Sequence, residues 1–261
     1  MNLPIGIFDS GAGGLTVLRE IAKRFPGESI VYFGDTARLP YGDKSQDTIS
    51  RYTHQCVNYL VTFPVKIVVI ACNTASAYAI HSLKDKFNIP VIDVVAPSAQ
   101  KACKTTVNGR IGVLGTAATI RSGCYQRAIH AMLPQANVFP IASPLFVPLV
   151  EENLIAHPAT ELLVKEYLKP LQLEKIDTLI LGCTHYPVLK ELISKTLGDS
   201  IQIIDSATCC ADTISLTSQN KTETPNYQFF VSDDIERFQR LATAFLPSNL
   251  LPLKVNLIAM D

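Results

Sequence analysis

The sequence predicts an α/β protein with two pseudo-symmetric, doubly wound parallel-sheet domains. Short apolar runs alternate along the chain with stretches of helical periodicity, as in consecutive βαβ units. Two of these runs end alike, in Cys72 and in Cys183, each followed by hydrogen-bonding residues and a helical pattern. The chain has 261 residues, more than the roughly 150 of a typical single domain.

The two cysteine segments belong to a longer internal repeat. Three pairs of segments match in chain order: 5–10 with 111–116, 66–74 with 177–185, and 89–93 with 201–205. The matches are collinear, because their spacings drift only from 106 to 111 and 112 residues. One sheet of similar buried strands would explain a single match, but three in order favour two related halves.

Hydrophobic periodicity defines the elements in chain order. Strands are predicted where short apolar runs occur, at 5–8, 30–33, 67–71, 91–95, 111–114, 137–141, 178–181 and 201–204. Helices are predicted where apolar residues recur every three to four positions, at 14–25, 46–63, 74–87, 97–105, 119–133, 159–169 and 186–197. The last is well marked, with Pro187 in its first turn and Gly198 at its end.

The C-terminal part of the chain predicts a further strand, helix and strand. A polar, turn-rich loop is expected at 217–225. The strands follow at 229–231 and 253–258, on either side of a helix at 233–245.

Composition argues against several classes of protein. Lysine plus arginine and aspartate plus glutamate both number 23, so neither a nucleic-acid nor an anionic-membrane partner is expected. No apolar run approaches the about 18 residues of a membrane span, and the N-terminus lacks signal-peptide features. The seven cysteines, an odd number, then predict reduced thiols in the cytoplasm.

Polar and reactive side chains gather where predicted strands end. These ends carry Asp9-Ser10, residues 35–42, Cys72-Asn73-Thr74, Thr116 and Cys183-Thr184-His185. Ligands of parallel α/β sheets bind beyond the carboxyl ends of the strands. If the two halves face each other, the sequence predicts one site in the cleft between the domains.

Cys72 and Cys183 are the candidate reactive groups. Both follow a strand and precede a predicted helix, whose N-terminus lowers a thiol pKa and binds anions. Thiols on opposite sides of one substrate can take a proton from one face of a carbon and return one to the other. The alternative reading, a small buried apolar side chain, is expected for the remaining candidates, Cys103, Cys124, Cys209 and Cys210.

Other uses of the cysteines and glycines fit the sequence less well. A zinc site from Cys72, Cys183 and His185 would lack the usual ligand spacing, and no Cys-x-x-Cys pair indicates thiol–disulfide exchange. The glycine-rich residues 10–14 lack both the ending of a phosphate loop and the spacing of a dinucleotide fingerprint. We therefore expect no nucleotide cofactor, and a zinc site is the less favoured reading of these residues.

Asp9 and His185 are candidate helpers of the thiols. Asp9 could accept a substrate ammonium or a cysteine proton, or could simply cap a turn. His185, two residues past Cys183, could steer a proton to that thiol or be an ordinary surface histidine. Glu151 follows an apolar run, and its spacing alone does not separate it from the solvated start of a helix.

Four motifs together resemble the bacterial glutamate racemases. They are DSGAGGL at 9–15, YFGDTARLPYG at 32–42, ACNTAS at 71–76 and LGCTHYP at 181–187. Residues 115–120 and 144–151 also match, and the similarity runs from about residue 5 to 212, with a weaker echo at 229–245. The last motif alone indicates only the broader cofactor-independent amino-acid racemases, whereas 35–42 with both cysteine motifs is more specific to glutamate.

The resemblance implies interconversion of L- and D-glutamate, which supplies D-glutamate for peptidoglycan, without pyridoxal phosphate or metal. It implies that Cys72 serves the D-enantiomer, assisted by Asp9, and that Cys183 serves the L-enantiomer, assisted by Glu151 and His185. The substrate contacts that it implies are Asp9, Ser10, Pro40, Tyr41, Gly42, Asn73, Thr74, Thr116, Thr184 and His185.

The resemblance also implies a homodimer and a discontinuous domain arrangement. One domain would comprise residues 1–97 plus 208–261, and the other residues 98–207. Two features depart from the family pattern, namely Asn153 in place of an expected Gly and the paired Cys209-Cys210.

The weak acidity of an amino-acid α-proton sets a further requirement. A thiolate alone is insufficient, so N–H donors must stabilise the carbanion through the α-carboxylate. Asn73, Thr74, Thr184 and the helix N-termini are candidates. Arg38, the arginine near the motifs, could be a surface residue. Two alternatives remain: another racemase or isomerase of the superfamily, acting on aspartate or another small acid, and a two-lobed binding protein without turnover.

Overall fold

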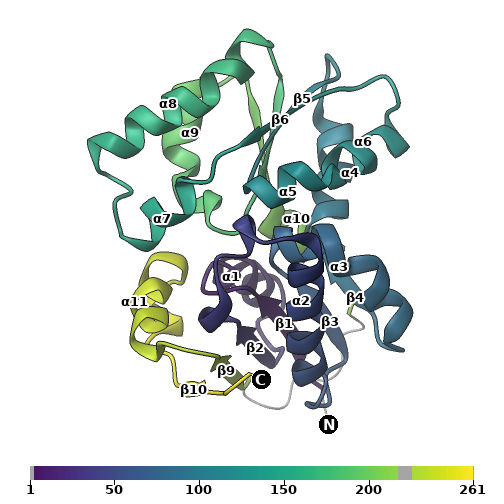
Figure 1. The fold of residues 1–261 in the computed structure, drawn as a ribbon, viewed down its shortest axis with the longest axis vertical. Helices are drawn as coiled ribbons and strands as arrows, with labels where there is room; N and C mark the ends of the chain where they lie inside the picture. Colours follow the sequence, from purple (N-terminus) through teal and green to yellow (C-terminus); the bar gives the residue numbers. More distant parts are fainter. Residues whose placement is uncertain (1–2, 217–224, 261) are drawn as a thin grey trace.

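The computed structural model describes residues 3–216 and 225–260 and contains two parallel β-sheets. The larger sheet has the strand order β10-β9-β2-β1-β3-β4, and the smaller one β6-β5-β7-β8. Each sheet lies at the centre of one of the two lobes in Figure 1. The predicted α/β fold with two parallel-sheet domains is confirmed. The predicted loop at 217–225 lies, except for its last residue, outside the described residues.

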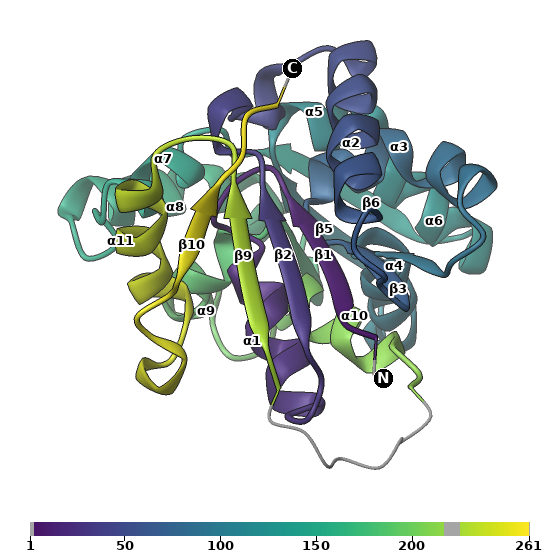
Figure 2. The same ribbon diagram turned by 90° about the horizontal axis from the view of Figure 1, so that it is seen from below.

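The larger sheet forms the first lobe. Its strands are β1 (Ile5–Asp9), β2 (Ile30–Gly34), β3 (Ile67–Ile70), β4 (Val91–Asp93), β9 (Tyr227–Val231) and β10 (Val255–Leu257). The helices that follow these strands are α1 (Leu15–Arg24), η1 (Thr36–Arg38), η2 (Tyr41–Asp43), α2 (Gln46–Leu60), α3 (Asn73–Lys86), α11 (Ile235–Phe245) and η4 (Ser248–Leu250). Figure 2 shows β10, β9, β2 and β1 side by side.

Both faces of the larger sheet are covered, which explains its continuous apolar strands. Ile5 and Ile7 of β1 pack in one cluster with Leu15 of α1, whereas Phe8 packs in another with Ile49 of α2. Alternate residues of a strand point to opposite faces, so the apolar residues of β1 meet helices on both faces of the sheet. This arrangement is doubly wound, as predicted.

The smaller sheet repeats the central order of the larger one. Its strands are β5 (Arg110–Gly115), β6 (Asn137–Ala142), β7 (Thr178–Gly182) and β8 (Gln202–Asp205). The order β6-β5-β7-β8 corresponds to β2-β1-β3-β4, so the matched sequence segments occupy matching places. The remaining helices are α4 (Val95–Thr105), α5 (Ala117–Ser122), α6 (Cys124–Met132), α7 (Phe146–Glu151), α8 (Pro158–Leu173), η3 (Tyr186–Leu189), α9 (Lys190–Leu197) and α10 (Ser206–Thr213).

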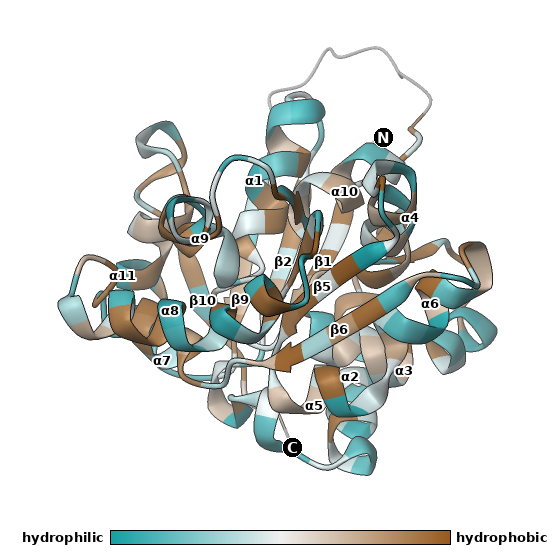
Figure 3. Cartoon of the chain, turned by 90° about the horizontal axis from the view of Figure 1, so that it is seen from above, coloured by the Kyte–Doolittle hydropathy of each residue, from teal (hydrophilic) through white to brown (hydrophobic). Residues whose placement is uncertain are grey.

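Hydrophobic residues concentrate in the interior of both lobes. All five strand positions after Arg110 in β5 are buried apolar or glycine residues, and all of β7 is buried. Figure 3 shows the hydrophilic residues mostly on outer helices such as α6. Among the described residues, no helix combines the length and apolar character needed to cross a membrane.

Several element boundaries differ from those that the sequence predicted. The single helix expected at 119–133 is two helices, because Gly123 adopts a left-handed φ of 66° between α5 and α6. The strand expected at 91–95 ends at Asp93, whose carboxylate accepts hydrogen bonds from the N–H groups of Val95 and Ala96 and so begins α4. The helix expected at 186–197 starts as the four-residue 3-10 turn η3.

The domain limits stay a prediction. The limits expected near 97 and 207 fall within α4 and α10, the two helices at which the chain passes between the sheets. Because α4 and α10 also contact each other, the two lobes share this region rather than meeting at a flexible linker.

Candidate active site

The carboxyl ends of strands from both sheets open onto one cavity of about 260 Å³. This volume is near the low end of the about 300–1,000 Å³ of pockets for drug-sized ligands, so the cavity suits a small molecule. The residues that line it are Ser10, Gly11, Leu39, Pro40, Tyr41, Gly42, Asp43, Cys72, Asn73, Thr74, Thr116, Pro144, Val147, Pro148, Glu151, Glu152, Cys183, Thr184, His185 and Arg237. The strand ends therefore converge as the repeat predicted.

Asp9 is the one predicted site residue that does not line the cavity. It ends β1 with no exposed surface and accepts hydrogen bonds from the N–H of Gly11 (2.9 Å) and from Oγ1 of Thr184 (3.5 Å). Burial raises the pKa of Asp9, although His185 and the N–H groups of Gly11 and Gly14 oppose this. Direct contact between Asp9 and a substrate remains a prediction.

Cys72 is held at the start of α3. Its sulfur accepts a hydrogen bond from the N–H of Ala75 (3.4 Å), and its thiol donates to Oγ of Ser10 (3.4 Å). Burial, with a contribution from Asp9, raises the pKa of Cys72 to about 12, although Ser10 and Ala75 act against the shift. For this residue, the expectation that a helix N-terminus would lower the thiol pKa is wrong, because desolvation outweighs the N–H group.

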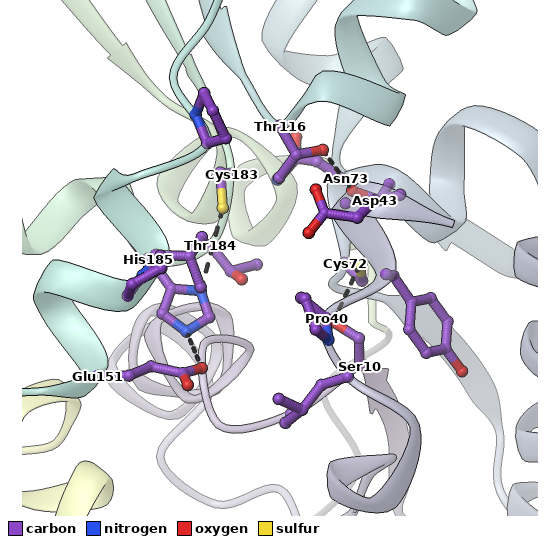
Figure 4. Close-up of a pocket in the computed structure, with 18 of the residues that line it drawn as sticks. Ser10, Pro40, Asp43, Cys72, Asn73, Thr116, Glu151, Cys183, Thr184 and His185 are labelled. Atoms are coloured by element: carbon purple, nitrogen blue, oxygen red, sulfur yellow. Dashed lines mark hydrogen bonds and ion pairs between the residues drawn. The ribbon is translucent and has the colours of Figure 1, made fainter. Parts of the chain in front are cut away.

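Cys183 occupies the corresponding place after β7, but its surroundings differ. The chain continues into the short turn η3 rather than directly into an α-helix. Its sulfur lies 4.0 Å from Nδ1 of His185. Cys72 thus caps a helix, whereas Cys183 faces an imidazole, and Figure 4 shows the two thiols approaching the cavity from different lobes.

His185 and Glu151 form a buried pair next to Cys183. Glu151 accepts a hydrogen bond from Nε2 of His185 at 3.0 Å (Figure 4). Burial lowers the pKa of His185, but its hydrogen bonds with Cys183 and Glu151 outweigh this and raise it to about 10. Burial also raises the pKa of Glu151, yet His185 and Arg237 more than compensate and lower it. The pair is therefore an imidazolium and a carboxylate at neutral pH.

Glu151 and His185 are both buried, although the sequence also allowed a solvated helix start and a surface histidine. Glu151 is only 7% exposed and His185 only 6%, so neither is a solvated helix start nor a surface histidine. Asn153 has a positive φ of 55°, a left-handed conformation that glycine adopts most readily. Asparagine can replace the expected glycine there because it tolerates this conformation better than most residues.

Hydrogen bonds across the cleft hold Asn73 and Thr74 in place. Oγ1 of Thr74 lies 2.9 Å from Oγ1 of Thr116 and 3.0 Å from Oγ1 of Thr119. Oδ1 of Asn73 accepts a hydrogen bond from the Tyr125 hydroxyl at 2.6 Å. Residues of the second lobe therefore orient side chains that the first lobe presents to the cavity.

Two glycines allow the lobes to approach closely. A Cβ on Gly13 would lie 2.4 Å from Oγ1 of Thr184 and 2.5 Å from Nδ1 of His185. A Cβ on Gly42 would lie 2.8 Å from Cβ of Thr116. At Gly13, the backbone of the loop between β1 and α1 therefore lies directly against side chains of the site.

Arg38 is not a surface residue, because its side chain binds the buried Asp35 next to the cavity-lining turn. Its side chain is 14% exposed and its Nε donates to both carboxylate oxygens of Asp35 (2.8 and 3.1 Å). The same buried carboxylate accepts hydrogen bonds from the hydroxyls of Tyr41 (2.5 Å) and Ser232 (2.9 Å). The Asp35 network thus anchors the turn that presents Pro40, Tyr41 and Gly42.

The sequence interpretation missed Asp43 and Arg237, which both line the cavity. Asp43 directly follows a recognised motif, and this adjacency was its only signal. Arg237 lies on α11, 86 residues along the chain from its partner Glu151. Only the weak similarity at 229–245 pointed to that helix, and it singled out no residue.

Comparisons with known proteins identify the family to which the chain is similar. The Asp/Glu/Hydantoin racemase family model matches residues 5–214. The glutamate racemase of Persephonella marina is 49% identical over 95% of each chain, and that of Streptococcus sanguinis is 43% identical over 98% of this chain and 97% of the other.

Solved structures show the same similarity. The glutamate racemase isoform RacE1 from Bacillus anthracis superposes with a TM-score of 0.93 at 38% identity, covering 99% of this chain and 98% of that one. The Francisella tularensis glutamate racemase in complex with D-glutamate has a TM-score of 0.91 at 36% identity, covering 100% and 98%. The Picrophilus torridus aspartate racemase, at 19% identity and a TM-score of 0.56, shares the fold alone.

Proposed function

The chain belongs to the Asp/Glu/hydantoin racemase family, and we propose that it interconverts L- and D-glutamate with Cys72 and Cys183 on the two sides of the α-carbon. The observation that carries this proposal is that both thiols, matched by the internal repeat, line one small cavity from different lobes. Relatives named glutamate racemase, 43–49% identical over most of this chain, support glutamate over aspartate as the substrate.

The two thiols exchange roles with the direction of reaction. From L-glutamate, the Cys183 thiolate removes the α-proton and the Cys72 thiol donates a proton to the opposite face. From D-glutamate, Cys72 is the base and Cys183 the acid. The raised pKa of Cys72 keeps this thiol protonated at neutral pH, as its role as the acid from L-glutamate requires. Acting as the base, Cys72 must first lose its proton, and the nearby Asp9 carboxylate is the candidate acceptor.

His185 and Glu151 assist Cys183 in both directions. The imidazole lies 4.0 Å from the sulfur, near enough to exchange a proton with the thiol after a small adjustment. Glu151 binds the other ring nitrogen and so determines which nitrogen faces Cys183. We propose that His185 and Glu151 together keep Cys183 in the protonation state that each direction requires.

Carbanion character at the α-carbon needs stabilisation by donors rather than by the thiols. The first N–H groups of a helix have no partner within it, and α3 begins at Asn73 beside Cys72. Asn73 and Thr74 are already oriented by Tyr125 and Thr116. Donors that are already oriented need little reorganisation free energy during the reaction. We propose that these donors bind the α-carboxylate.

The wider role is part of the same proposal. Racemisation would supply D-glutamate for peptidoglycan. A cytoplasmic location, which the cysteine content predicts, and assembly as a homodimer, which the family resemblance implies, are proposed with it.

Replacing either thiol tests the proposal directly. We expect Cys72→Ala and Cys183→Ala each to abolish racemisation, because each removes the only proton carrier on one face of the α-carbon. The loss should exceed 10²-fold, the lower end of the about 10²–10⁴-fold that a positioned acid–base group contributes. The rate is measured from the loss of the circular dichroism signal of one glutamate enantiomer. The far-ultraviolet circular dichroism spectrum of each variant checks its fold.

The choice of starting enantiomer and substrate sharpens the experiment. In D₂O, the wild type should exchange the Cα proton of both L- and D-glutamate, which a binding protein without turnover would not do. Full two-way racemisation by Cys183→Ala would overturn the two-thiol mechanism. Faster turnover of aspartate than of glutamate would favour the alternative substrate.

A further inference from the structure

Helix α11 of the first lobe reaches the buried Glu151–His185 pair of the second. Nη2 of Arg237 donates hydrogen bonds to Oε2 of Glu151 (3.0 Å) and to Oε1 of Glu152 (3.1 Å). The other carboxylate oxygen of Glu151 binds His185. Each oxygen of Glu151 thus has one cationic partner, and the two partners come from different lobes; Figure 1 shows α7 and α11 facing each other.

The burial of Glu151 makes its second partner important. A buried carboxylate stays ionised only when it is paired and hydrogen-bonded. Without Arg237, Oε2 of Glu151 would lose this partner. The carboxylate would then be free to rotate or to take up a proton, and its hold on the His185 ring would weaken.

The same helix also touches the imidazole. Phe245 packs edge-on against His185, with ring centroids 5.6 Å apart and an interplanar angle of 89°. Arg237 and Phe245 are eight residues apart on α11, about two helical turns, so both project from one side of the helix. One element therefore contacts both members of the pair that faces Cys183.

We infer that Arg237 is a positioning residue for the Cys183 half of the reaction, acting through Glu151 and His185. The inference rests on the proposed two-thiol racemisation. Arg237 supplies charge and alignment to Glu151 and takes up no proton itself. Its buried Nε has no hydrogen-bond partner within residues 3–216 and 225–260, so the two glutamates, not Nε, determine where the guanidinium lies.

Stability and catalysis should respond differently to the loss of Arg237. The side chain is 37% exposed, and partly exposed ion pairs add little to folding stability. A purely structural role would therefore predict little change in either melting temperature or rate. A positioning role predicts a clear loss of rate that is confined to proton transfer at Cys183.

The test compares Arg237→Met with Arg240→Met. Arg240 lies on the same helix but is exposed and outside the cavity, so it controls for loss of an arginine from α11. We expect kcat/KM of Arg237→Met to fall roughly tenfold in both directions, a part of the about 10²–10⁴-fold that acid–base assistance supplies. Arg240→Met should keep the wild-type value.

Primary deuterium isotope effects identify the affected half-reaction. When the Cys183 step slows, the isotope effect on kcat/KM should rise for L-[2-²H]glutamate, whose bond Cys183 breaks. The isotope effect should fall for D-[2-²H]glutamate. Cys72 breaks the Cα–²H bond of this substrate before the slowed Cys183 step, so that cleavage limits the rate less. Arg237→Lys, which keeps the charge but loses the planar guanidinium, should lie between Arg237→Met and wild type in both readouts.

Each result decides the inference. Equal isotope effects in Arg237→Met and wild type, or a rate equal to that of Arg240→Met, would overturn the positioning role. A wild type that exchanges no Cα proton of either enantiomer would instead refute the proposed function. Thermal melting followed by circular dichroism confirms that the variants compared are folded.

Discussion

Cys72 and Cys183 occupy equivalent places, but different groups control their protons. A fully buried carboxylate and a serine hydroxyl accompany Cys72, whereas an imidazolium–carboxylate pair accompanies Cys183. A catalyst for two mirror-image substrates must present a reactive group on each side of a chiral carbon. Because the substrate is not symmetric about that carbon, the two sides need not have the same helpers.

The ionised His185–Glu151 pair makes a pH-dependent contribution to stability. The pKa of His185 is raised from 6.5 to about 10, so the folded state binds a proton more tightly than the unfolded state. The contribution is therefore full below about pH 6.5 and is lost as the pH rises toward 10. We expect His185→Asn to cost about 3 kcal/mol at pH 6, the low end for breaking a buried ion pair.

Urea unfolding of wild type and His185→Asn at several pH values measures this effect. The difference in free energy of unfolding should shrink steadily between pH 6.5 and 10. A difference that grows with pH would contradict the assignment of a protonated His185 in the folded state.

At the scale of elements, loop and helix ends rather than helix interiors build the site. Cys72 is the cap of α3, Glu151 is the last residue of α7, and His185 immediately precedes η3. The glycine-rich loop between β1 and α1 lies against Thr184 and His185, with Gly13 at the closest approach. Such positions tolerate little displacement, because a shift of one element moves a reactive group relative to the other lobe.

Gly13→Ala should therefore damage catalysis more than stability. Its Cβ would lie 2.5 Å from Nδ1 of His185, so the loop or the imidazole must move. A misplacement of about 1 Å can cost about 10²-fold in rate, and we expect a loss of that order in kcat/KM.

Gly109→Ala is the matched control for a glycine replacement. Gly109 has a φ of 72° with open space around it and does not line the cavity. This change should lower the free energy of unfolding by about 1 kcal/mol through backbone strain while leaving kcat/KM unchanged. Equal activity of the two variants would show that the Gly13 contact is unimportant.

At the scale of the whole molecule, the cavity joins two lobes that repeat one topology. Thr74 bonds Thr116 and Thr119 across the cleft, and Arg237 bonds Glu151 across it. Residues of both lobes line this cavity, so a ligand that fills it would contact both. Its binding should consequently stabilise the molecule as a unit and not one lobe alone.

Calorimetry of the Cys72→Ala/Cys183→Ala double variant tests this coupling without turnover. D-Glutamate at 100 times its dissociation constant should add about 2.7 kcal/mol to the free energy of unfolding. The whole transition should move to higher temperature together. A shift of only one of two separate transitions would show that the ligand binds a single lobe.

Much of the fold and the site could be predicted from local patterns. Buried parallel strands leave continuous apolar runs, so β1, β3, β5 and β7 were predicted to within one or two residues. The cysteines at the ends of β3 and β7 followed from the repeat. Predicted boundaries were wrong where the conformation of a single residue determines them. Gly123, for example, divides a predicted helix into two.

The sequence by itself determined the two-sheet architecture, the two thiols and the polar motifs around them, because these depend on residues that are close along the chain. Only the tertiary structure decided which groups are buried and what they meet. It buried Asp9 outside the cavity lining, raised the pKa of Cys72 through desolvation and brought Arg237 to Glu151 from 86 residues away. Burial and long-range pairing depend on how elements pack, and no local pattern encodes them.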